Sequence, residues 1–192
     1  MIEEINLNNS VWALSRGIND LLETIEEDSE TLKNTANRFC GAYAEILEGY
    51  TMDPQKFLEK DFEVTPSNDL VLVKNVPFYS LCKHHILPFF GTVSVGYLPD
   101  KKVIGLSKIP RLISCFSRRL QIQEVLGREI CNAMMVSNLK PKGVITVIKA
   151  RHLCMEMRGI QATGAVTTTA SIEGVFIENS GLKNEAYNLM EG

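Results

Sequence analysis

Residues 91–107 read GTVSVGYLPDKKVIGLS. As far as Tyr97 the sequence alternates in the manner of a strand with two different faces. Pro99 to Lys102 then supplies turn-forming residues, and the residues that follow resume the pattern of a short strand. The stretch therefore predicts an antiparallel hairpin, which is the first indication of how the sheet of this protein is built.

The sequence on both sides of this hairpin contains further strands and helices. Residues 69–78 (DLVLVKNVPF) have the β-branched run of a buried strand. Residues 109–138 predict a helix, a break near Leu120 and a second helix, whereas residues 142–157 and 164–178 predict strands. The order of helices, hairpin, two helices and hairpin is that of an α+β fold with antiparallel pairing, not of alternating βαβ units.

The N-terminal part of the chain is predicted to be helical. Residues 31–50 place aromatic and aliphatic residues on one helical stripe, and residues 51–68 lose this periodicity and contain two prolines. We therefore expect a helical segment over residues 1–65 and an α+β domain over residues 66–192. The earliest of these helices is indicated by apolar residues at helical spacing, namely Val11, Leu14, Ile18, Leu21, Leu22 and Ile25.

The composition limits the classes of protein to which this chain can belong. Its 192 residues carry a net charge of −3, so bulk charge does not predict binding to nucleic acid. No stretch approaches the roughly 18 apolar residues of a membrane span, and the first residues lack the basic and apolar regions of a signal peptide. The five cysteines are an odd number, which argues against a disulfide framework. We expect a cytoplasmic protein that binds neither nucleic acid nor membranes.

Two short segments contain the residues that suggest chemistry. Residues 80–91 (SLCKHHILPFFG) hold Cys82 and His85 at a Cys-x-x-His spacing, which can chelate one metal ion from a single turn. Further along, His152 and Cys154 are two positions apart and would share one face of a strand. Four ligands would close a structural zinc site, whereas three ligands and a water molecule would form a catalytic one.

The simpler alternative is that these cysteines are packed in the core, as lone cysteines usually are. Against this, all three histidines of the chain lie beside two of its five cysteines. From the residues alone, a metal site and ordinary core packing stay open as alternatives of similar weight.

Several longer signatures resemble the GTP cyclohydrolase I family, in order and in spacing, over about residues 70–177. They are FYSLCKHHILPFFG (78–91), GYLPDKKVIGLSKIPR (96–111), RRLQIQEVLGREI (118–130) and HLCMEMRGIQATGAVTTTA (152–170). The resemblance implies the tunnelling fold, an antiparallel sheet with helices packed on one face. It also implies a ring-forming homo-oligomer, usually a decamer, with active sites between subunits.

The same resemblance implies an activity. Members of the family hydrolyse the guanine imidazole ring of GTP, release formate and form 7,8-dihydroneopterin triphosphate, a precursor of folates and other pterins. Carried over by position, Cys82, His85 and Cys154 would bind Zn²⁺, which leaves one coordination position for water. His84 and His152 would then be the acid–base pair, without an assignment of which residue makes which proton transfer.

Substrate contacts follow from the resemblance in the same way. Glu124 would accept hydrogen bonds from the guanine N1–H and amino groups, and Gln123 would support it through its amide. Ser107 would contact the ribose or base, although a serine at a helix start is equally an N-cap. The triphosphate would be bound by cationic residues, namely Lys108, Arg111, Arg158 and, with a looser match, Arg38.

One residue beside the expected metal site departs from the family pattern. Lys83 stands where the family usually has glutamate, which reverses a charge without removing a ligand. Two alternatives to an active enzyme follow. One is a catalytically silent paralogue that keeps zinc and binds a purine or a partner. The other is a different tunnelling-fold enzyme, such as the nitrile reductase of queuosine biosynthesis. The His-x-Cys pair at 152–154 and the long GTP-binding signatures disfavour the second alternative.

Overall fold

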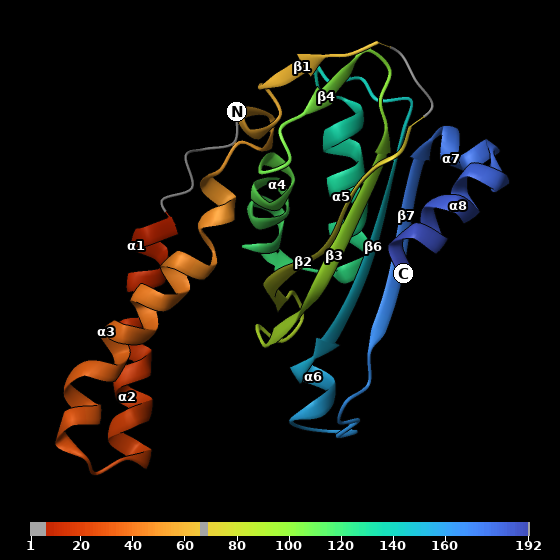
Figure 1. Ribbon diagram of the computed structural model, residues 1–192. Coiled ribbons are helices and arrows are strands. Elements are labelled where there is room, and N and C mark those ends of the chain that lie inside the picture. Colours follow the sequence, from red (N-terminus) through yellow and green to blue (C-terminus); the bar gives the residue numbers. More distant parts are fainter. Residues whose placement is uncertain (1–6, 66–68, 192) are drawn as a thin grey trace. The chain divides into compact units, whose positions relative to one another are not determined.

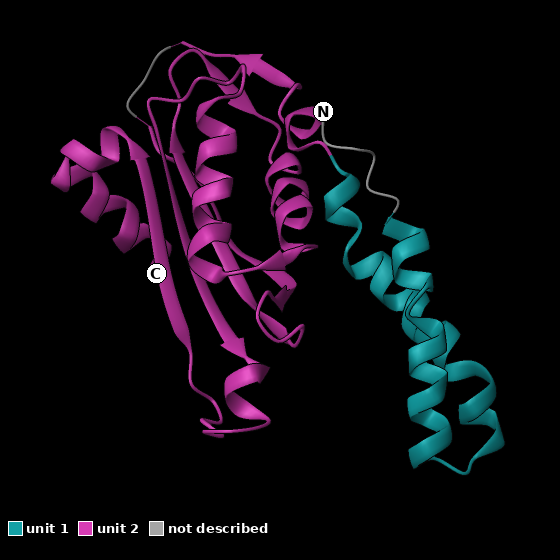
Figure 2. Cartoon of the chain, turned by 180° about the vertical axis from the view of Figure 1, so that it is seen from behind, with its two compact units in different colours: residues 1–52 teal, residues 53–192 magenta. Residues whose placement is uncertain are grey.

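The computed structural model describes residues 7–65 and 69–191 (Figure 1). The chain forms two compact units, Met1–Met52 and Asp53–Gly192, which are coloured separately in Figure 2. The sequence predicts a boundary at residue 65, which lies inside the second unit. Among the described residues, no helix combines the length and the apolar character that crossing a membrane requires.

The first unit consists of three helices, α1 (Leu7–Trp12), α2 (Ser15–Ile25) and α3 (Ser29–Ile46), followed by the 3-10 turn η1 (Glu48–Thr51). The helix expected from the apolar spacing between Val11 and Ile25 is thus divided at residues 13–14. Asp28 caps α3, because its carboxylate accepts a hydrogen bond of 2.7 Å from the Thr31 amide.

The second unit is built on a five-stranded sheet in the order β5-β2-β3-β6-β7. Its strands are β2 (Val71–Cys82), β3 (Pro88–Leu98), β5 (Leu120–Gln121), β6 (Gly143–His152) and β7 (Thr167–Gly174). The β2–β3, β3–β6 and β6–β7 pairs are antiparallel, as predicted. The short β5 pairs in parallel with β2, so the sheet is mixed, and the prediction of an antiparallel sheet was wrong at this edge.

The opening hairpin prediction was also wrong in its pairing. Strand β4 (Lys102–Ile104) does not pair with β3 but forms a separate two-stranded sheet with β1 (Asp61–Glu63), which lies in residues 51–68, where the sequence predicts no strand. The hairpin in which β3 takes part is instead β2–β3, joined by the turn at residues 83–87. Between η1 and β1 the chain forms a second 3-10 turn, η2 (Pro54–Phe57).

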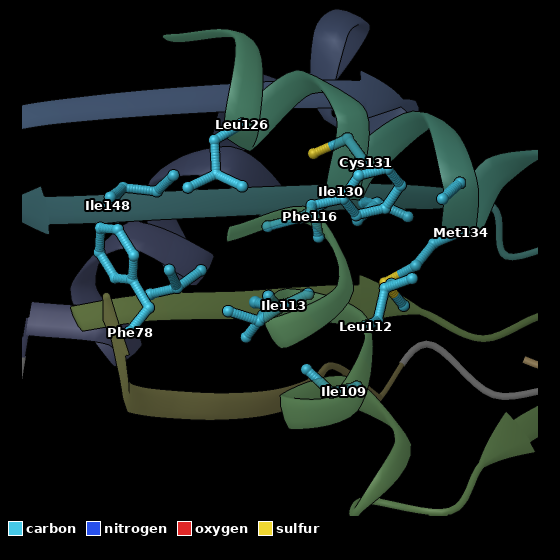
Figure 3. Packing of buried hydrophobic residues seen from close by; sticks show 14 of the residues in the cluster. Phe78, Ile109, Leu112, Ile113, Phe116, Leu126, Ile130, Cys131, Met134 and Ile148 are labelled. Atoms are coloured by element: carbon cyan, nitrogen blue, oxygen red, sulfur yellow. The ribbon is translucent and has the colours of Figure 1, made fainter. Parts of the chain in front are cut away.

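Helices α4 (Lys108–Ser117) and α5 (Gln123–Met135) cover one face of the sheet. Their buried side chains meet those of β2, β3 and β6 in the main core, as Figure 3 shows for Phe78, Ile113, Leu126 and Ile148. Burying one such aliphatic or aromatic side chain contributes about 1.5–3 kcal/mol, so this layer holds the sheet and both helices together.

The opposite face carries a second, smaller core. There α7 (Val175–Glu178) and α8 (Ser180–Glu191) pack through Phe176, Ala186 and Met190 on Ile145 of β6. The expectation that helices cover only one face was therefore wrong. Successive strand residues point to opposite faces. Val144 and Ile148 consequently belong to the main core, whereas Ile145 between them faces α8.

Candidate functional site

The Cys-x-x-His segment lies at the turn between β2 and β3. The carbonyl oxygen of Cys82, the last residue of β2, accepts hydrogen bonds from the His85 amide (3.2 Å) and the Ile86 amide (2.8 Å). Ile86 adopts a left-handed conformation with φ 55°. This tight turn brings the imidazole of His85 back over Cys82, with 3.6 Å between His85 Nδ1 and Cys82 Sγ.

The second segment lies at the end of β6. His152 is the last residue of the strand, and the chain then turns into α6 (Leu153–Glu156). Cys154 is therefore on a helical turn, and the expectation that it continues the strand beside His152 was wrong. The Arg151 guanidinium donates to the Glu156 carboxylate from Nε at 2.8 Å, which ties α6 to the end of the strand that precedes it.

The two segments meet because of the strand between them. In the sheet register Phe89 of β3 pairs with Ser80 of β2 on one side and with His152 of β6 on the other. The ligand atoms of Cys82, His85 and Cys154 consequently lie within 4.8 Å of one another. The structure thus brings together the three residues that the sequence nominates as metal ligands.

The chemistry of this group fits a metal ion. Cys82 is buried, Cys154 is half-buried and His85 is exposed. Burial and the neighbouring Cys82 raise the pKa of the Cys154 thiol, because two thiolates at this distance repel each other. A divalent cation removes that repulsion, and thiolate sulfur with imidazole nitrogen is a donor set that such ions prefer.

His152 is held firmly beside this group. Its ring stacks on Phe89 with centroids 4.7 Å apart and an angle of 5° between the planes. Its Nε2 lies 2.7 Å from Oε1 of Gln123. Burial lowers the pKa of His152, and the nearby Glu124 carboxylate acts in the opposite direction.

His84 differs from His152 in its surroundings. It is exposed, and its ring meets that of His85 edge-on with centroids 6.2 Å apart. His84 is not part of the group of candidate ligands, and its exposed ring is accessible to a bound molecule. Lys83, the departure from the family pattern, is also exposed in this turn.

The residues expected to recognise guanine begin α5. Glu124 is exposed in the first turn of the helix, where a carboxylate is favoured by the unpaired backbone amides. Gln123 is 2 % exposed, and its amide nitrogen lies within hydrogen-bonding distance of Ile148 O, Thr167 O and Thr169 Oγ1. The polar atoms of Gln123 are therefore engaged within the protein.

The expected phosphate-binding residues are distributed over several places. Arg158 follows α6 and lies near enough to Cys154 to lower the pKa of its thiol. Arg38 belongs to the first unit, where it pairs with Glu30 at 3.1 Å. Ser107 occupies the N-cap position of α4 without a side-chain capping bond.

Lys108 and Arg111 are at the start of α4, at the far end of this helix from the metal-ligand group. The C-terminal end of α4 leads into β5, whose Gln121 pairs with Cys82. Because a helix of ten residues is about 15 Å long, residues in its first turn are remote from that end. Figure 1 shows β4, which precedes α4 in the chain, toward one end of the sheet and α6 at the other. Within one subunit, the structure does not bring these residues to the metal-ligand group.

Sequence reasoning missed three contributions to the site. These are the stacking of Phe89 on His152, the ion pair of Arg151 with Glu156, and the hydrogen bond between Gln123 and His152. The first and third depend on long-range register, for which the sequence carries no local signal. Arg151 and Glu156 are five positions apart, which is not a spacing at which helical side chains meet.

The Cys82–His85–Cys154 group has the donors of a metal-dependent enzyme, and the sequence comparisons define the family. The family model described as GTP cyclohydrolase I matches residues 14–191. This chain is 45% identical over 175 residues to GTP cyclohydrolase 1 of Campylobacter jejuni subsp. doylei, covering 90% of this chain and 92% of that protein. It is 42% identical over 179 residues to GTP cyclohydrolase 1 of Finegoldia magna, covering 92% and 96% of the two chains. The chain therefore belongs to the GTP cyclohydrolase I family.

Among solved structures, the apo form of the archaeosine synthase QueF-Like is similar with a TM-score of 0.44 and 18% sequence identity. That similarity covers 56% of this chain and 96% of the other. It is too low to support a conclusion about fold or function.

Proposed function

We propose that this protein is a GTP cyclohydrolase I. It hydrolyses the imidazole ring of the guanine of GTP, releases formate and yields 7,8-dihydroneopterin triphosphate, the first step of tetrahydrofolate and pterin biosynthesis. The observation that carries the proposal is the convergence of Cys82, His85 and Cys154, with His152 beside them, in a chain of this family. A cytoplasmic location stays a prediction from the sequence.

Zinc is the metal that we propose for this group. Two cysteine sulfurs and one histidine nitrogen form a three-ligand set, which is typical of catalytic zinc sites because one position stays open. A zinc ion bound there supplies Lewis acidity and lowers the pKa of a water molecule toward neutral pH.

The proton transfers are assigned to His84 and His152. His152 is fixed by Phe89 and Gln123, which suits a group that must meet the same substrate atom in each turnover. His84 is exposed and has the freedom to reach a bound nucleotide. Glu124, whose carboxylate is near enough to act on the pKa of His152, would accept hydrogen bonds from the N1–H and amino group of guanine. Adenine lacks this pair of donors and would leave the carboxylate unsatisfied.

We further propose that the complete site forms between subunits of a homo-oligomer, with a decamer as the expected assembly. The separation of Lys108 and Arg111 from the metal-ligand group within one subunit supports this, since a triphosphate attached to a guanine near His152 needs cations close by. A neighbouring copy can supply Ser107, Lys108 and Arg111, while Arg158 comes from the subunit that holds the metal.

The activity is tested by incubating zinc-loaded protein with GTP and measuring formate together with neopterin fluorescence after oxidation. Both products are expected in equal amounts, and a chelator-treated sample is the control. Zinc-replete, assembled protein that binds GTP but releases no formate would refute the proposal and favour a catalytically silent nucleotide-binding paralogue.

A further inference from the structure

We propose that Gln123 is a positioning residue that fixes the tautomer of His152. Neutral His152 carries its proton on Nε2 and directs the lone pair of Nδ1 toward the substrate. The tautomer itself follows from hydrogen-bond geometry, whereas its use in catalysis rests on the function proposed above.

The argument begins with the orientation of the Gln123 amide. Its nitrogen is 3.2 Å from the carbonyl oxygen of Ile148 in β6 and 3.0 Å from that of Thr167 in β7. Backbone carbonyls only accept hydrogen bonds, so the group that faces them must be the NH₂ group. The reversed amide would place an oxygen against two oxygens in a buried site. The orientation of Gln123 is thus determined by two strands of the sheet.

With the nitrogen fixed, the amide oxygen has only one role available. Oε1 of Gln123 lies 2.7 Å from Nε2 of His152 and can only accept a hydrogen bond. His152 Nε2 must therefore donate, and the neutral imidazole has its single proton there. The other tautomer would set the Nε2 lone pair against the Oε1 lone pairs at this distance, in a place where Gln123 is 2 % exposed.

The ring cannot avoid this contact by rotating. It is stacked on Phe89, which is fully buried, and the His152 backbone pairs with Phe89 at the end of β6. Nδ1 is consequently the only ring nitrogen that can exchange a proton with the substrate. In the step that follows, Nδ1 accepts a proton from an O–H or N–H group of the reacting molecule, which leaves an imidazolium with both nitrogens protonated. The same proton returns from Nδ1 to a nitrogen of the opened ring, and Nε2–H stays bonded to Gln123 throughout.

This reasoning gives Gln123 a different role from the one that the resemblance implies. Because its amide nitrogen is engaged by the sheet and the residue is only 2 % exposed, Gln123 has no N–H group left to donate to guanine. Its removal should therefore lower kcat and leave KM for GTP nearly unchanged, whereas a residue that contacts guanine would raise KM. By analogy with partners that orient metal-ligating histidines, we expect the loss of Gln123 to cost about 10- to 100-fold in activity.

The chain contains a matched control in Gln121. It is also a buried glutamine (4 % exposed), and its amide nitrogen donates to Phe116 O at 2.9 Å and to Glu129 Oε2 at 2.7 Å. None of its described hydrogen bonds involves His152. Gln121→Met and Gln123→Met thus make the same chemical change two residues apart, and only the second removes the acceptor for His152 Nε2.

The direct test is ¹⁵N NMR of histidine-labelled, zinc-loaded protein without GTP, at a pH where His152 is neutral. The protein has only three histidines, so three sets of signals are expected. His85 is distinguished by its zinc bond, and the signals that disappear in His84→Gln belong to His84, which leaves those of His152. We expect His152 to show Nε2 protonated and Nδ1 unprotonated in the wild-type protein and in Gln121→Met. Gln123→Met should lose this preference.

A wild-type His152 with its proton on Nδ1 would overturn the proposal even if no variant folds. An unchanged tautomer in folded Gln123→Met would overturn it as well. Steady-state kinetics add the second readout, with kcat of Gln123→Met expected to fall about 10- to 100-fold and KM to stay within about twofold. Because the NMR measurement needs no turnover, an inactive protein with the expected tautomer would refute the proposed function and leave the role of Gln123 intact.

Discussion

At Gly91, strand β3 leaves no room for a side chain against the backbone of β6. A Cβ atom added there would lie 2.0 Å from the Lys149 carbonyl oxygen and 2.8 Å from the Ala150 Cα atom. Both are backbone atoms, so no side-chain rotation can relieve the contact. We therefore predict that Gly91→Ala forces the two strands apart next to the site.

The size of the effect follows from these distances. The Cβ atom needs about 1 Å more room to reach the 3.0 Å below which real contacts are essentially not found. A shift of that size weakens the two ladder hydrogen bonds around the Gly91–Ala150 pair, each worth about 1 kcal/mol net. Overpacking a well-filled interior adds about 1–3 kcal/mol. We expect the free energy of unfolding to fall by about 3 kcal/mol, a large part of the roughly 5–15 kcal/mol of an ordinary domain.

The assay is urea unfolding followed by far-UV circular dichroism at one fixed subunit concentration. Gly41→Ala in α3 is the control, because nothing lies within 4 Å of its added Cβ and alanine favours the helix by up to about 1 kcal/mol. The two glycines should thus respond in opposite directions. A Gly91→Ala protein within about 0.5 kcal/mol of the wild type would show that the strands are not in the close contact described.

Three further predictions concern thiols and histidines. Cys154→Ser should lose zinc, measured as metal content, because an alcohol is a far poorer zinc ligand than a thiolate. It should also lose formate release while keeping its circular dichroism spectrum. Full turnover would contradict the ligand assignment. His84→Ala should keep its zinc and lose formate release, whereas loss of zinc would indicate that His84, not His85, binds the metal. Burial raises the pKa of the Cys131 thiol to about 12 from 9.0, so between these values the folded protein keeps a proton that the unfolded chain releases. The free energy of unfolding should then fall with rising pH by at most about 1.4 kcal/mol per pH unit, and Cys131→Ala should flatten that slope in urea titrations above pH 9; an unchanged slope would contradict the shift.

The local parts of the site were predictable from sequence, because a Cys-x-x-His turn closes on itself. Residues 82–86 need only their own backbone hydrogen bonds to bring His85 over Cys82. The pairing of β4 with β1, the parallel β5 and the packing of α8 on the second face were not predictable in this way. Each depends on which distant segment competes best for a strand edge or an apolar face, and the alternation of residues within a strand does not encode its partner.

The position of Cys154 was predicted correctly, but its local conformation was not. The spacing predicts that Cys154 shares a strand face with His152, whereas the chain turns into α6 after His152. His152 and Cys154 nevertheless lie near one site, as expected. The helical turn of α6, held by the ion pair of Arg151 with Glu156, keeps Cys154 at the end of β6. The same residues can thus be brought together by a local conformation other than the one predicted.

Strand β3 contributes no metal ligand, yet it determines whether the site exists. Because successive side chains of a strand point to opposite faces, moving β3 by one residue against β6 would turn Phe89 away from His152 and turn Phe90 toward the core. The same shift against β2 would move the end of β6, with His152, by about 3.3 Å relative to Cys82. The ligand atoms lie within 4.8 Å of one another, so a displacement of this size would separate them too far to bind one metal ion. The register Ser80–Phe89–His152 is therefore as necessary to the metal site as its ligands, and it is held by packing in the main core, not by the chemistry of the site.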